Sequence, residues 1–205
     1  MAESETPKVK AYLDSNILAN WFLLYRKRKT WERLDDVLRA KQSMLFHEDI
    51  RHKRFNVGFI TSAWAVSEIV QAAIDYIISV RMIKEGSSLD RLYKYKRNNP
   101  LSKEQIDEIR RSLQAFLKHL RKMGIEFATF RFGSGAVQNF ALEYSIDTPD
   151  ALHLTLASGV CHYFITNDEE LCRKGIKEID VLLPANFRTK GAVRVHNAAT
   201  MQHNI

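Results

Sequence analysis

Four acidic residues stand where an apolar segment of this chain stops or where a helix is expected to start: Asp14, Glu68, Asp150 and Asp168. Carboxylate oxygens are the ligands that Mg²⁺ and Mn²⁺ prefer. Such an ion can orient and activate a water molecule and stabilise charge on a phosphodiester oxygen. Without a counterion, two carboxylates about 4 Å apart repel by roughly 4 kcal/mol at an effective dielectric near 20. If the four acids converge, they predict a divalent-metal site that hydrolyses phosphodiesters.

Short apolar strands alternate with helices along the chain, a pattern typical of a parallel sheet covered on both faces. Strands are expected at residues 9–13, 55–60, 125–130, 162–166 and 179–183. Helices are expected at residues 17–25, from residue 34, and at 65–77, 102–122, 135–144 and 149–158. The predicted fold class is therefore α/β, a three-layer α/β/α sandwich with a short, mainly parallel central sheet.

The crossover rule predicts that the four acids meet. Right-handed connections place the carboxyl ends of parallel strands at one edge of the sheet, and ligands bind in the crevice outside that edge. Asp14 and Asp168 each follow a predicted strand directly. Glu68 and Asp150 lie in the first turns of predicted helices.

Each acid also has a structural explanation. Asp14 and Asp168 suit helix caps, and Asp150 suits the positive end of a helix dipole. Glu68 could face solvent. These readings remain open for each acid taken singly, and convergence of all four is what favours a metal site.

Four motifs in series carry a resemblance to a known family. They are Tyr12-Leu13-Asp14-Ser15-Asn16-Ile17-Leu18, Glu68 shortly after Ile60-Thr61-Ser62, Asp150-Ala151-Leu152-His153-Leu154, and Ile165-Thr166-Asn167-Asp168. Together they resemble the PIN domain family over residues 8–183. That family comprises small α/β/α nucleases, many of them VapC-type toxins, that cut RNA with Mg²⁺ or Mn²⁺.

The resemblance implies a metal-dependent endoribonuclease that leaves a 5′-phosphate and a 3′-hydroxyl. It assigns Asp14, Glu68, Asp150 and Asp168 as catalytic metal ligands, with Ser15, Thr166 and Asn167 as supporting polar residues. It also implies an RNA substrate, a homodimer, and for a toxin an antitoxin or other regulatory protein. The alternative is a catalytically silent PIN-like module that binds RNA or a protein partner.

Length and composition predict one domain. The 205 residues divide into a disordered lead at 1–7, a domain at 8–187 with helical insertions near 26–54 and 85–122, and a polar tail at 188–205. The polar start and apolar runs shorter than roughly 18 residues predict a cytoplasmic protein with no signal peptide and no membrane contact. Cys161 and Cys172 form no metal-binding spacing, and we expect no disulfide between them.

The formal net charge of +7 permits a polyanionic partner. Two basic clusters supply the candidate RNA-binding residues Arg51, Lys53, Arg54, Tyr93, Lys94, Lys96 and Arg97. Tyr93 and Tyr95 could stack on single-stranded bases. Alternatively, this segment is a solvated charged helix whose two tyrosines pack on the core of the protein.

Other residues near the motifs favour structural roles. The apolar flanks of His153 favour a packed or hydrogen-bonded histidine over a metal contact. Asp147, before Pro149, favours a turn acid. Glu169 and Glu170 favour a solvated first helical turn, with a further acid of the metal site as the alternative.

Overall fold

The computed structural model describes residues 9–25, 34–129 and 134–190. Its centre is a five-stranded, all-parallel sheet in the order β3-β2-β1-β4-β5. The strands are β1 (Lys10–Leu13), β2 (Gly58–Ser62), β3 (Glu126–Ala128), β4 (Tyr163–Ile165) and β5 (Asp180–Leu182). The α/β class and the parallel sheet expected from the sequence are confirmed. The predicted lead at 1–7, the charged run at 26–33 and residues 191–205 of the predicted tail lie outside the described residues.

Helices connect the strands in the alternation that the sequence predicts. They are α1 (Ser15–Tyr25), α2 (Leu34–Arg51), α3 (Ala63–Lys84), the short 3-10 helix η1 (Leu89–Arg91), α4 (Leu92–Asn98), α5 (Lys103–Lys122), α6 (Ser134–Tyr144), α7 (Thr148–Ser158) and α8 (Glu169–Arg173). A capping box opens α5, because Ser102 and Gln105 bond each other reciprocally.

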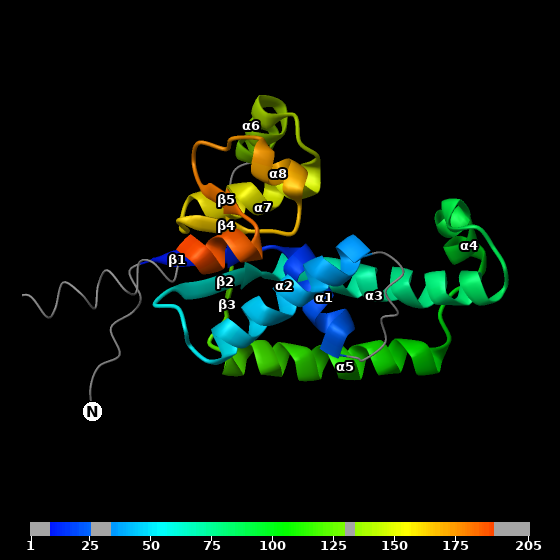
Figure 1. Ribbon diagram of the computed structural model, residues 1–205. Coiled ribbons are helices and arrows are strands. Elements are labelled where there is room, and N and C mark those ends of the chain that lie inside the picture. Colours follow the sequence, from blue (N-terminus) through cyan, green and yellow to red (C-terminus); the bar gives the residue numbers. More distant parts are fainter. Residues whose placement is uncertain (1–8, 26–33, 130–133, 191–205) are drawn as a thin grey trace, which may run out of the picture.

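Side-chain alternation in β1 builds a core on each face of the sheet. Ala11 and Leu13 join a cluster with residues of α1, α2, α3 and α5, whereas Tyr12 joins a second cluster with residues of α7. Figure 1 shows α6, α7 and α8 on one side of the sheet and α1, α2 and α5 on the other. This arrangement fits the three-layer sandwich expected from the sequence.

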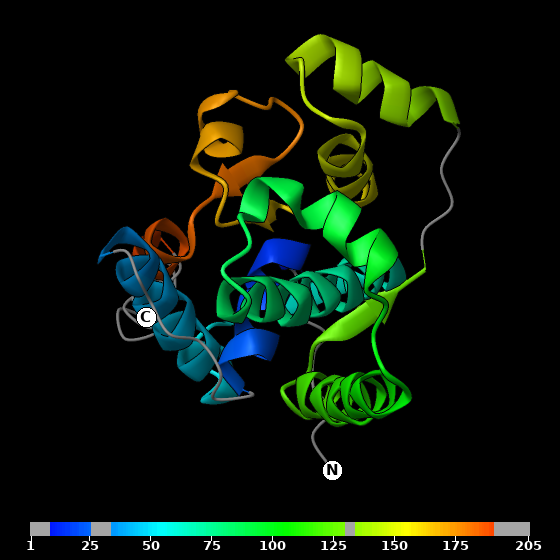
Figure 2. The same ribbon diagram turned by 90° about the vertical axis from the view of Figure 1, so that its right-hand side faces the viewer.

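The longest connection forms an arm beyond the sheet. α3 starts at the carboxyl end of β2 and runs outward, and α5 returns alongside it towards β3 (Figure 1). α4 and α5 lie on opposite sides of α3, as the view in Figure 2 also shows. The amino-terminal part of α3, which carries Glu68, therefore stays at the sheet.

α3 is long and apolar enough, by length and composition alone, to cross a membrane, although acidic residues such as Glu68 and Asp75 interrupt its apolar runs. Core helices of soluble proteins have the same properties, so the feature is weak. α3 contributes five buried side chains, namely Ala65, Ile69, Ala73, Ile78 and Met82.

Two further boundaries differ from the prediction. β2 begins at Gly58 and not at residue 55, because the chain turns after α2 with Lys53 at φ 52°. Residues 184–190 are helical, whereas a polar tail was expected from residue 188. This helix buries Phe187 against Phe46 and Phe59, so its first turns belong to the core.

Candidate functional site

Asp14 is buried at the carboxyl end of β1, with 2 % of its surface exposed. Its Oδ1 accepts hydrogen bonds from the Ser15 backbone N–H at 2.6 Å and from the Ser15 hydroxyl at 3.3 Å. Its Oδ2 accepts from the Thr166 hydroxyl at 2.8 Å. Leu13 pairs with Ile165 in the sheet, so the next residues along β1 and β4 lie side by side.

Thr166 connects Asp14 to the turn that carries Asp168. Its hydroxyl oxygen accepts from Asn16 Nδ2 at 2.7 Å and from the Asp168 backbone N–H at 3.0 Å. Asn16 Oδ1 in turn accepts from the Asn167 backbone N–H at 2.9 Å. Ser15, Thr166 and Asn167 thus lie at the predicted place. Asn16 was not proposed as a site residue, although its position directly after Asp14-Ser15 was the signal for it.

Glu68 lies in the second turn of α3 and is partly exposed. Its Oε2 is 2.9 Å from His153 Nε2, and its Oε1 accepts from Trp64 Nε1 at 2.9 Å. Burial raises the pKa of Glu68, but hydrogen bonds from His153 and Ser15 outweigh burial and lower it overall. Ser15 therefore contacts both Asp14 and Glu68, which brings these two acids together.

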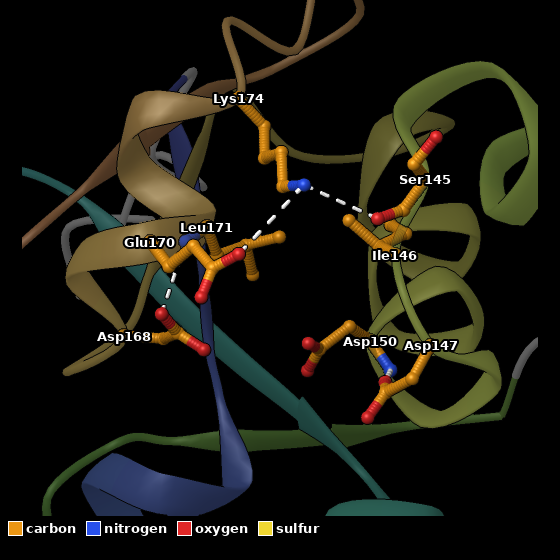
Figure 3. A pocket seen from close by; sticks show the side chains of 8 residues that line it. All are labelled: Ser145, Ile146, Asp147, Asp150, Asp168, Glu170, Leu171 and Lys174. Carbon is orange, nitrogen blue, oxygen red and sulfur yellow. Dashed lines mark hydrogen bonds and ion pairs between the residues drawn. The ribbon is translucent and has the colours of Figure 1, made fainter.

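Asp150 and Asp168 line one pocket of about 220 Å³ and point into it from opposite walls (Figure 3). Asp150 comes from the first turn of α7, and Asp168 is the N-cap of α8, where its side chain accepts from Leu171 N–H. The capping role expected as the alternative for Asp168 is thus confirmed. Its second carboxylate oxygen is free of that cap bond, so capping and ligand binding are compatible.

Charge repulsion links Asp150 to the other acids. Burial, and after it the charges of Asp147, Asp14 and Asp168, raise the pKa of Asp150 to about 7. Burial also raises the pKa of Asp14, against the opposing effect of His153 and of the Thr166 hydrogen bond. The acids therefore form one electrostatic group with too little positive charge among them.

Among the described residues that line this pocket, Lys174 is the one cation. Its Nζ donates to the Ser145 carbonyl at 3.2 Å and lies 3.8 Å from Glu170 Oε1. Lys174 thus reaches across from the α8 side to the turn before α7 (Figure 3). It faces the same space as Asp150 and Asp168.

The residues fit a hard divalent cation by donor chemistry, since they offer carboxylate oxygens and hydroxyls. In the described part of the chain, no three His, Cys, Asp or Glu side chains stand close enough to form a preassembled metal cluster. The acids instead form two pairs, Asp14 with Glu68 around Ser15 and Asp150 with Asp168 across the pocket. The raised pKa of Asp150 indicates that a cation would lower the free energy of this arrangement.

Four nearby residues make contacts that fit the structural roles expected of them. His153 is buried and hydrogen-bonded. Asp147 is the N-cap of α7 and accepts from the Asp150 backbone N–H at 3.0 Å. Glu169 pairs with Arg173 at 3.1 Å, while Glu170 lines the pocket with an exposed side chain.

The first basic cluster lies away from the acids. Arg51, Lys53 and Arg54 precede β2 and so lie at the amino-terminal edge of the sheet, opposite Asp14. Arg51 pairs with Glu48, and Arg54 pairs with Asp49, each at 2.6 Å. The structure therefore does not bring these three candidates to the acidic edge.

The second basic cluster lies on α4, on the side towards which the strands' carboxyl ends point (Figure 1). Tyr93 is 81 % exposed, so it does not pack on the core, and Lys94 and Arg97 are also exposed. Lys96 pairs with Asp75 at 2.6 Å, and the Tyr95 hydroxyl donates to Glu85. Tyr93, Lys94 and Arg97 are thus the accessible members of this cluster.

No known protein family model matches this chain, and no curated protein sequence matches it. The PIN family therefore stays a resemblance carried by the four motifs.

Proposed function

We propose that this protein is a metal-dependent endoribonuclease in which Asp14, Glu68, Asp150 and Asp168 hold one or two Mg²⁺ or Mn²⁺ ions. The observation that carries the proposal is the position of the Asp150 carboxyl group together with its raised pKa. Its carboxylate shares a pocket with Asp168, feels the charge of Asp14, and has a pKa raised to about 7. Acidic residues whose surroundings disfavour the ionised form are typical of functional sites.

When bound, the cation supplies an activated water and offsets charge on the scissile phosphate. The chain's own residues orient the acids for this task. Ser15 and Thr166 hold both oxygens of Asp14, and Thr166 also holds the backbone at Asp168. A cation in the pocket would favour the ionised form of Asp150, whose proton would pass to solvent, and the Lys174 ammonium at the same pocket would attract a phosphate.

The net charge of +7 supports a polyanionic substrate, and the exposed residues of α4 offer a surface for it. Tyr93, with Lys94 and Arg97 beside it, can stack on an unpaired base while the cations contact phosphates. We therefore place single-stranded or looped RNA across α4 and the acidic pocket. A homodimer, a cytoplasmic location and an antitoxin that offers an Arg to the acids complete the proposal.

The test is Mn²⁺-driven cleavage of mixed structured RNAs, with Ca²⁺ as the blocking ion and with mapping of both product ends. Asp14→Asn and Asp150→Asn should each abolish cleavage while the circular dichroism spectrum stays unchanged. Asp147→Asn is the matched control, because asparagine also caps a helix and Asp147 lies on the rim of the same pocket. We expect it to keep most of the activity.

Full activity in both the Asp14 and Asp150 variants would overturn the assignment. Tight, salt-sensitive RNA binding with no cleavage at any Mn²⁺ concentration would favour the silent binding module instead.

A further inference from the structure

A line of buried polar groups leads from β2 to Glu68. Ser62 Oγ lies 2.7 Å from the Tyr12 hydroxyl, which lies 2.8 Å from His153 Nδ1. His153 Nε2 lies 2.9 Å from Glu68 Oε2. Ser62, Tyr12 and His153 are each at most 3 % exposed, so this hydrogen-bond chain lies out of reach of solvent and joins β2, β1 and α7 to α3.

The chemistry of the groups gives the hydrogen-bond chain a direction. A carboxylate only accepts, so His153 Nε2 must donate to Glu68. In the neutral ring Nδ1 then accepts, and the Tyr12 hydroxyl must donate to it. The Tyr12 oxygen can in turn accept from the Ser62 hydroxyl, whose oxygen also accepts from the Ala65 backbone N–H at 3.1 Å as the cap of α3. Both ring nitrogens of His153 are thus satisfied.

These two hydrogen bonds exclude His153 as a metal ligand and support a role as a fixed hydrogen-bond donor. With Nε2 bonded to Glu68 and Nδ1 bonded to Tyr12, neither nitrogen of His153 has a lone pair left for a metal ion. The ring is held in place instead, because Tyr12 is itself anchored by parallel stacking on Phe164, with ring centroids 5.4 Å apart at 8°. His153 is therefore a rigid donor aimed at Glu68.

Glu68 depends on such a donor more than Asp14 does. It stands on a helix with several rotatable side-chain bonds, whereas Asp14 is short, buried and held at both oxygens. Glu68 has two other partners, Ser15 and Trp64, and the Trp64 side chain is 47 % exposed and so gives a less rigid hold. A carboxylate has about four acceptor sites, so Glu68 keeps one for a ligand beside these three donors.

We propose that His153 is the positioning residue for Glu68, and that the Ser62–Tyr12–His153 hydrogen-bond chain orients this carboxylate for the divalent cation. The role rests on the proposed metal-dependent function. Partners of this kind, which hold a metal-binding side chain without touching the metal, typically change metal affinity about 10- to 100-fold when they are removed.

Two amide variants of His153 distinguish the role of Nε2 from the role of Nδ1. The Gln amide of His153→Gln can reach the place of Nε2 and keep a donor to Glu68, while the shorter amide of His153→Asn reaches only the place of Nδ1. We expect His153→Asn to weaken Mn²⁺ binding about 10-fold or more in calorimetric titration, and His153→Gln to stay within about 3-fold of the native protein. Tyr12→Phe, which removes the partner of Nδ1 at nearly constant volume, should weaken binding by an intermediate factor.

A double-mutant cycle with Glu68→Gln tests whether His153 affects Mn²⁺ affinity through Glu68 or through a general change in structure. In the Glu68→Gln background, His153→Asn should cause no further loss of Mn²⁺ affinity. An equal loss in both backgrounds overturns the proposal, and so does unchanged affinity in both His153→Asn and Tyr12→Phe. Circular dichroism and melting temperature confirm that each variant is folded, and Tyr12→Phe serves as the test if His153→Asn is not.

Nitrogen NMR of the metal-free protein separates this role from the nuclease itself. It records which ring nitrogen of His153 carries a proton, and we expect a proton on Nε2 whose signal moves in Glu68→Gln. That signal together with Mn²⁺ binding in the native protein supports the role. Its absence overturns the hydrogen-bond chain, whereas its presence without any Mn²⁺ binding overturns the proposed function and the metal role together.

Discussion

The Thr166 hydroxyl donates to Asp14 Oδ2 at 2.8 Å, across 152 positions of sequence and between the carboxyl ends of two neighbouring strands. The same oxygen accepts from Asn16 and from the Asp168 backbone. This one hydroxyl therefore sets the geometry of two of the four proposed metal ligands.

Replacing Thr166 by Val should distinguish the contribution of its hydrogen bonds from that of its side-chain volume. Val keeps the volume but removes the hydrogen-bond partner of Asp14 Oδ2 and of Asn16 Nδ2, which should cost about 1–3 kcal/mol of unfolding free energy. Urea denaturation measures this loss, and the Mn²⁺ affinity of Thr166→Val should fall with it. Thr166→Ser keeps the hydroxyl and should retain affinity; equal affinity in the Val variant and the native protein would contradict the role of Thr166.

Asp150 should make the metal-free protein less stable as the pH rises. Its pKa is about 7 in the folded state and about 3.9 in an unfolded chain, so between these values the folded state binds more protons. Stability is therefore lost from about pH 4 to pH 7, and the loss is complete above about pH 7. Asp150→Asn should melt higher than the native protein at pH 8 and at nearly the same temperature at pH 4.

Melting curves with and without Mn²⁺ complete this prediction. Added Mn²⁺ should raise the melting temperature of the native protein at pH 8, because a ligand that binds only the folded state stabilises it. Asp150→Asn should respond much less. A pH-independent difference between the two metal-free proteins would show that Asp150 is not under charge strain.

The His47–His119 pair should weaken the protein in acid. Their Nε2 atoms are 2.9 Å apart and join α2 to α5, which requires one nitrogen to donate and the other to accept. Burial lowers the pKa of His47, as does the charge of His119, and burial and Arg51 lower the pKa of His119. Since both values lie below the ordinary 6.5, the unfolded chain takes up protons first and stability is lost as the pH falls below about 6.5.

His119→Gln isolates this effect. It removes one titrating ring, so its unfolding free energy should depend less on pH between about 7.5 and 5 than that of the native protein. Glu48, Arg51 and Lys122 also act on the pair, and they are unchanged in this variant. A difference between the two proteins that stays constant over this range would contradict the prediction.

Phe187 should be essential to stability although it lies near the end of the described chain. It is 1 % exposed and its ring contacts those of Phe46, Phe55, Phe59 and Tyr163. Phe187→Ala should lower the unfolding free energy by about 3–5 kcal/mol through lost burial and the cavity left behind. Phe187→Leu should cost clearly less, and if the Ala variant were as stable as the native protein, helix 184–190 would not belong to the core.

The sequence by itself determined the features that depend on neighbours along the chain. The alternation of short apolar strands with helices placed most of these elements, and the strand ends placed Asp14 and Asp168. Parallel topology then followed from the alternation of strands and helices, because the hand of each crossover is nearly invariant. The four acids could be selected on that basis.

Only the tertiary structure decided which distant groups meet. Phe187 was placed at the end of the predicted domain and given no role, because one aromatic residue in a short polar stretch has no local signature, yet its ring is buried in the core. His153 and Glu68 are 85 positions apart, and their bond depends on how α7 packs against α3 across the sheet. The raised pKa of Asp150 likewise comes from burial and from charges on other elements, which no local pattern encodes.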